Sequence, residues 1–319
     1  MPVTALTRKA GTHLVSEMTP TAPRRGPSFG IATAPSQVAY DDLARVWREA
    51  DTIPQIEHAW LYDHLMPIFG DPDGPTFEGW TLLAALAAQT ERLRLGLLVT
   101  SNRFRPPAML AKIAAGVDVI SGGRLEFGIG AGSNLTVPTA RREYDAHGLP
   151  FPGAADAVGS LAEACAIITR LWTADAPFDF DGSYHHLTGA FCSPKPVQRP
   201  YPPVMIGGRS TPTLRVVARY GDRWNMPGGS IGDAIARSAV LDRLCAEIGR
   251  DPAEITRSII LPAPYDRPAG TRAAIRAALD GGFSHIVLSL GAPYPDQAAR
   301  WAADTLIAPF TDHEGAGDR

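Results

Sequence analysis

The sequence is poor in cysteine. Its three cysteines, Cys165, Cys192 and Cys245, are far apart, and no two of them form a CxxC pair. An odd number of separated cysteines argues against a disulfide framework and against a structural zinc site. We therefore expect a reducing compartment, with the cytoplasm as the default.

Lysine is also scarce: the only lysines among the 30 basic residues are Lys9, Lys112 and Lys195. The first lies in a polar N-terminal segment, the second in a predicted helix and the third in a proline-rich connection. A Schiff-base lysine at a strand end, the nucleophile of aldolase-like barrels, therefore has no candidate.

Long hydrophobic runs and a strong charge imbalance are also absent. No apolar stretch reaches the length of a membrane span. The net charge is −3, so we expect neither nucleic acid nor an anionic membrane as a partner. His185 and His186 are adjacent but lack further ligands at a metal-binding spacing, and no metal site is predicted.

What the chain does contain is an alternation of strands and helices. Residues 93–99 form an apolar run typical of a strand covered on both faces, and the segment 106–120 has the three- and four-residue spacing of an amphipathic helix. Eight such strand–helix pairs can be placed. The strands are expected at 29–34, 58–63, 93–99, 125–130, 204–208, 222–225, 258–263 and 285–290.

Eight alternating pairs favour an α/β fold closed as a (β/α)8 TIM barrel, with loop insertions at its C-terminal face. We expect the barrel domain to span residues 28–310, between disordered tails at 1–27 and 311–319. The insertions that would shape the ligand pocket are expected in the loops 66–78, 133–152 and 179–192.

The active site of such a barrel lies at the carboxyl ends of the strands. Asp63 and His64 follow the second strand, and there an imidazole beside a carboxylate suits proton transfer near neutral pH. The alternative is a solvated loop pair with no chemical role. Other candidate site residues that end strands are Thr100, Asn102, Ala131 and Gly132.

Glycines mark two further strand ends. Gly207, Gly208 and Arg209 precede a predicted helix and could hold a phosphate through backbone amides and a guanidinium, although a plain strand-to-helix turn would look similar. Gly128 and Gly130 lack the full dinucleotide-binding spacing, so we expect them to make room for a flat ring against the strands.

Several motifs together resemble the bacterial luciferase-like oxidoreductases, in particular the branch that uses the deazaflavin coenzyme F420. The similarity extends over about residues 29–310. Its most specific pieces are WLYDHLMPIFGDPDGP (60–75), LVTSNRFRPPAMLAKIAAGVDVISGGRLEFGIGAG (98–132), SPKPVQRPYPPVMIGG (193–208) and ARYGDRWN (218–225).

The resemblance implies a flavin-like ring at the strand ends, above a non-proline cis peptide that would fall at Leu97–Leu98. It also implies a coenzyme phosphate at Gly207, Gly208 and Arg209. His64 would then transfer a proton next to the reactive carbon of the deazaflavin.

The position of the acidic residue found in similar sugar-phosphate dehydrogenases is occupied here by Ser133, which makes glucose 6-phosphate a poor substrate guess. In the preferred interpretation, Asp63 orients His64 and the enzyme moves a hydride between F420 and a small organic substrate.

An FMN-dependent monooxygenase served by a separate reductase is the alternative function, and a cofactor-binding protein without turnover is the third. A homodimer is expected in either enzymatic case.

Overall fold

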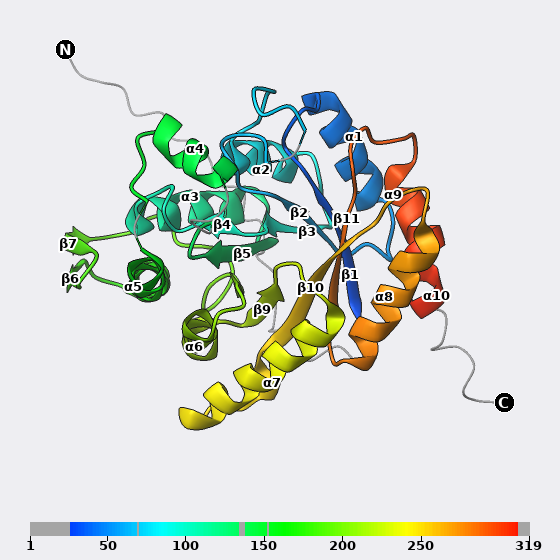
Figure 1. Cartoon of the computed structure of the whole chain (residues 1–319). Helices are drawn as coiled ribbons and strands as arrows, with labels where there is room; N and C mark the ends of the chain where they lie inside the picture. The colour runs from blue at the N-terminus through cyan, green and yellow to red at the C-terminus, as the bar shows by residue number, and fades with distance from the viewer. Residues whose placement is uncertain (1–25, 69, 134–137, 152, 312–319) are drawn as a thin grey trace, which may run out of the picture.

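The computed structural model describes residues 26–311, except 69, 134–137 and 152. Parallel strands form a closed barrel that is wrapped by helices (Figure 1). Almost all of the two expected tails lies outside the described residues. The predicted (β/α)8 TIM barrel is confirmed.

The strands pair in the order β3-β2-β1-β11-β10-β9-β8-β5-β4, and an additional pairing of β3 with β5 closes the barrel. β3 and β4 together occupy one of the eight positions around the barrel, because a bulge divides that strand into two pieces. The barrel strands are β1 (Ser28–Thr33), β2 (His58–Leu61), β3 (Arg94–Leu97), β4 (Thr100–Ser101), β5 (Leu125–Gly130), β8 (Val204–Gly207), β9 (Arg223–Met226), β10 (Thr256–Pro262) and β11 (His285–Ser289).

Helices between the strands form the outer layer (Figure 1). They are α1 (Tyr40–Asp51), α2 (Gly79–Ala87), α3 (Pro107–Ile120), α5 (Ala154–Thr173), α6 (Thr211–Tyr220), α7 (Ile231–Glu247) and α8 (Pro268–Asp280). The last described elements are α9 (Ala298–Trp301), a π-helical turn (Ala302–Ile307) and α10 (Ala308–Thr311). A short 3₁₀ turn, Pro252–Glu254, precedes β10.

Two excursions leave the barrel between β5 and β8. Helix α4 (Pro138–Ala146) follows β5, and a hairpin of β6 (Phe178–Asp181) and β7 (His186–Ala190) follows α5. Both fall where the sequence predicted insertions at the C-terminal face. α4 is the element that matters most for the site, because it carries two fully buried polar side chains.

The hydrophobic core is divided by the barrel wall. The larger part packs between strands and helices, whereas a small cluster of Ala32, Trp60, Leu98, Met205 and Val287 fills the barrel interior. Because strand residues alternate between the two faces, this interior cluster lies directly below the strand carboxyl ends. It gives the candidate site an apolar base.

Charged and histidine side chains gather at the opposite, amino-terminal end of the barrel interior. The carboxylate of buried Glu126 pairs with Arg94 and Arg223. The rings of His58 and His285 stack beside it, with centroids 3.9 Å apart. Burial, together with repulsion by Arg223 and Arg94, holds the pKa of each histidine well below its ordinary value.

Candidate functional site

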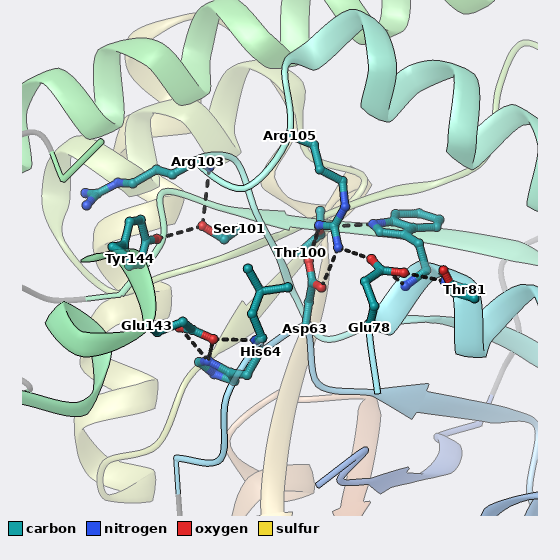
Figure 2. A network of polar contacts seen from close by, with 12 residues as sticks. Asp63, His64, Glu78, Thr81, Thr100, Ser101, Arg103, Arg105, Glu143 and Tyr144 are labelled. Carbon is teal, nitrogen blue, oxygen red and sulfur yellow. Dashed lines mark hydrogen bonds and ion pairs between the residues drawn. The ribbon is translucent and has the colours of Figure 1, made fainter. Parts of the chain in front are cut away.

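The carboxyl ends of β2, β4 and β5 form one side of the candidate site, and α4 packs against them (Figure 2). Asp63 and His64 follow β2, Thr100 and Ser101 make up β4, and Gly132 follows β5. The predicted residues from these three strand ends therefore lie close together. The side chains fall into three groups, around Asp63, His64 and Ser101.

His64 is paired with a carboxylate from α4. Its Nδ1 lies 3.2 Å from both Oε1 and Oε2 of Glu143. The Glu143 side chain is 1% exposed and also accepts the backbone N–H of Leu65 at 2.5 Å, so it holds the loop after β2 as well as the imidazole. His64 itself remains 22% exposed, which leaves its ring accessible for proton exchange.

The expectation that Asp63 orients His64 is wrong. Asp63 has a fully buried side chain whose two oxygens bind the guanidinium of Arg105 at 2.7 and 3.0 Å. It also accepts the hydroxyl of Thr100. The two neighbouring side chains point in different directions: the Asp63 carboxylate lies against Arg105, and the His64 imidazole lies against Glu143 of α4 (Figure 2).

Arg105 joins Asp63 to the helix layer through a second ion pair, with Glu78 at the start of α2. Burial raises the pKa of Glu78, but donors from Thr81 and the charge of Arg105 outweigh this effect and lower it. For Arg105 the two carboxylates likewise outweigh burial and raise its pKa. A groove of about 600 Å³, lined mainly by residues of α2 and α3, also reaches Glu78 and Arg105. The two ion pairs connect the end of β2 to the start of α2.

The non-proline cis peptide expected at Leu97–Leu98 lies one residue later, at Leu98–Val99. The regular ladder still includes residue 98, whose amide donates to the carbonyl of Leu61 at 2.8 Å, and the bulge begins after it. Leu97 is correspondingly packed in the outer core, against the start of α2. Leu98 and Val99, rather than Leu97, face the barrel interior.

The glycines of β5 and β8 make room for this bulge. A Cβ atom on Gly130 or Gly207 would lie 2.8 or 2.9 Å from the side chain of Val99, and one on Gly128 would lie 2.0 Å from the carbonyl oxygen of Leu97. The structure thus gives the glycine pattern a reason other than the predicted approach of a ring. The missed residue, Val99, shows in the sequence only as part of an apolar run.

Ser101, Tyr144 and Arg103 form the third group (Figure 2). The hydroxyls of Ser101 and Tyr144 are 2.9 Å apart, and the Arg103 guanidinium lies over the Tyr144 ring at 5.7 Å. Gly132 fits against all three with a φ of +88°, and a Cβ there would meet the Tyr144 hydroxyl at 2.6 Å. Sequence reasoning identified Gly132 but neither Tyr144 nor Arg103.

Asn102 connects the strand ends to the hairpin. Its side-chain amide donates to the hydroxyl of Ser160 on α5, which in turn lies 3.0 Å from Nε2 of His185. The Oδ1 atom of Asn102 is buried and has no hydrogen-bond partner in the part of the chain that the structure describes. Ala131, the remaining candidate on this side, is partly buried at the edge of the outer core.

The predicted phosphate site lies across the mouth, between β8 and α6. The Gly208 amide is not free as expected, because it donates to the carbonyl of Asn225 at 3.2 Å. Ser210 caps α6 through its side chain. Arg209 is exposed and forms no ion pair or hydrogen bond with any described residue. Its guanidinium is available to an anion.

Metal ligands do not cluster in the described segments: no group of three or more His, Cys, Asp or Glu residues there could hold an ion. The described helices also include none that is long and apolar enough to cross a membrane.

Comparison with known proteins agrees with this geometry. The model of the luciferase-like monooxygenase family matches residues 25–319, nearly the whole chain. The chain belongs to this family. A solved F420-dependent secondary alcohol dehydrogenase, in complex with an F420-acetone adduct, superposes with a TM-score of 0.76 over 88% of this chain and 98% of that one. Their sequences are 17% identical, so this likeness concerns the fold.

The relatives of this chain include both a monooxygenase and a dehydrogenase. The pyrimidine monooxygenase RutA of Methylobacterium radiotolerans is 32% identical over 246 residues, which cover 75% of this chain and 61% of RutA. The F420-dependent hydroxymycolic acid dehydrogenase of Mycobacterium tuberculosis is 26% identical over 258 residues, covering 80% and 68%. Other relatives are 34% identical to this chain, and the chain spans about half of their length.

Proposed function

We propose that this protein is an oxidoreductase that transfers a hydride between coenzyme F420 and a small organic substrate. The observation that carries the proposal is the pair of His64 and Glu143 at the strand carboxyl ends, where an accessible imidazole is held by a buried carboxylate. F420-dependent dehydrogenases among the relatives and fold neighbours support the same choice.

The residues present fit such a coenzyme. Leu98 and Val99 of the bulge give a flat ring an apolar surface at the top of the barrel interior. Arg209 offers an exposed guanidinium for a phosphate, beside the amino terminus of α6. When bound, the coenzyme supplies the hydride chemistry, and the protein supplies position and protons.

In this proposal His64 exchanges the proton that accompanies hydride transfer. The Glu143 carboxylate accepts the Nδ1–H, which leaves Nε2 as the atom that gives or takes a proton. Asp63, Thr100 and Arg105 hold the strand end that carries His64 and take no part in the proton transfer.

The alternative is an FMN-dependent monooxygenase that receives reduced flavin from a separate reductase, and the RutA relative favours it. Anaerobic assays separate the two. F420-dependent hydride transfer to a panel of ketones, followed through coenzyme absorbance, should proceed without oxygen. Activity that requires FMN and consumes oxygen would replace this proposal by the alternative. We expect a cytoplasmic homodimer in both cases.

A further inference from the structure

Arg103 lies at the same mouth as His64 (Figure 2) and carries hydrogen-bond donors that no described residue accepts. Nε and Nη1 of Arg103 are buried, and neither has a hydrogen-bond partner within the described segments. A guanidinium stays charged at any physiological pH, and a desolvated charge is costly unless an anion or strong acceptor meets it. Burial accordingly lowers the pKa of Arg103, an effect that the nearby Tyr144 only partly offsets.

Aromatic rings fix where this guanidinium lies. The guanidinium carbon lies 5.7 Å from the ring centroid of Tyr144 and 5.3 Å from that of Phe151. The backbone N–H of Arg103 donates to the hydroxyl oxygen of Ser101. Stacking uses the flat faces of the guanidinium and leaves the in-plane N–H groups free. The side chain is therefore positioned, but its hydrogen-bonding capacity is not used.

The neighbouring hydroxyls add one more donor. Only one hydrogen can lie between the oxygens of Ser101 and Tyr144, which are 2.9 Å apart. The Ser101 oxygen accepts from Arg103, and that of Tyr144 has a backbone hydrogen bond from Ser133. The second hydroxyl hydrogen has no acceptor among the described residues, so the pair can donate one further hydrogen bond.

We propose that Arg103, with the Ser101–Tyr144 hydroxyl pair, binds a carboxylate or phosphate group of the ligand at the carboxyl ends of β4 and β5. An anion of this kind accepts hydrogen bonds and donates none, which matches the set of donors. The site rests on the proposed function only in that the ligand occupies the strand ends. The anion belongs either to the substrate or to a side chain of the cofactor.

The test uses the full-length protein and acetate, succinate and inorganic phosphate as probes, titrated by calorimetry with and without saturating F420. Arg103→Gln should weaken probe binding about ten- to a hundredfold, the effect of losing a charge-assisted contact. Tyr144→Phe keeps the stacked ring and should weaken binding less. Arg141→Gln is the matched control, because Arg141 also lies over Phe151 but is exposed and paired with Asp145.

The two sources of the anion give different results. If the substrate carries it, the probes bind with F420 present and Arg103→Gln leaves F420 affinity unchanged. If the cofactor carries it, F420 excludes the probes and Arg103→Gln weakens F420 binding. The proposal is overturned if folded Arg103→Gln binds every probe and F420 as the wild type does, or if the wild type binds no probe and the variant retains full F420 affinity. Probe binding to the protein without F420 is measurable even if F420 itself fails to bind.

Discussion

His64 and Glu143, which are 79 residues apart in the chain, are hydrogen-bonded at the mouth of the barrel, with 3.2 Å between Nδ1 and each carboxylate oxygen. The pair joins the end of β2 to α4. The carboxylate that orients the imidazole therefore comes from an insertion helix and not from the adjacent Asp63. This arrangement assigns separate roles to the two carboxylates and leads to the predictions that follow.

Replacing His64 with Ala should lower turnover by at least a hundredfold, the lower range for loss of a general acid or base. Coenzyme affinity should change little, because Arg209 lies on the other side of the mouth. His186→Ala is a suitable control, since His186 pairs with Asp181 on the exposed hairpin. Steady-state kinetics with near-wild-type turnover in His64→Ala would remove the proton-transfer role from this residue.

Glu143→Gln should reduce turnover less than His64→Ala does. The carboxylate holds the imidazole through Nδ1, and a neutral amide in its place would hold the ring less firmly. The Gln side chain can still accept the Leu65 amide, which keeps the loop in place. Turnover in Glu143→Gln equal to that of the wild type would contradict the orienting role.

Arg105→Ala should lower the free energy of unfolding by about 3–5 kcal/mol, because it leaves the buried carboxylate of Asp63 without its ion pair. Arg215→Ala serves as the control, since its partner Glu247 is exposed and such surface pairs contribute about 0–1 kcal/mol. Urea denaturation followed by circular dichroism measures both. Equal losses in the two variants would mean that the wall network contributes no more than a surface pair.

Stability should fall as the pH drops from about 6.5 toward 5, the range just below the ordinary histidine pKa. Burial lowers the pKa of His58 and His285 in the folded protein, so the unfolded chain binds more protons in this range and acid favours unfolding. The expected slope is about 1.4 kcal/mol per pH unit for each histidine that takes up a proton on unfolding. Urea titrations at several pH values would refute this if the free energy of unfolding stayed constant between pH 7 and 5.

Arg209→Ala should weaken cofactor binding about ten- to a hundredfold, as expected for a lost charge-assisted contact to phosphate. The variant should fold normally, because the guanidinium is exposed and makes no ion pair with any described residue. Arg219→Ala, on the last turn of the adjacent α6, is the control. Unchanged affinity in Arg209→Ala would move the phosphate to another part of the mouth.

Local patterns in the sequence were enough to predict most of the fold. Apolar runs located the eight barrel strands to within a few residues, because periodicity reports which face of each element is buried. The alternation of strands and helices then identified the closed architecture. The C-terminal π-helical turn was missed, since a change of hydrogen-bonding register has no signature in apolar spacing.

The candidate site was predictable only in part. Strand ends could be placed, which brought His64, Thr100 and Gly132 to one mouth. The partners of these residues could not be predicted, because Glu143 and Tyr144 come from an insertion whose position depends on tertiary packing. The same limit explains why Asp63 was assigned to His64: adjacency in sequence does not determine which way two side chains point.

The most direct test of this account is an equilibrium titration of the wild-type protein with F420 and with FMN in parallel, followed by fluorescence. The account predicts saturable binding of F420 that is tighter than that of FMN and is weakened by Arg209→Ala but not by His64→Ala. Tight FMN binding without F420 binding would contradict it and would assign the site to the monooxygenase alternative.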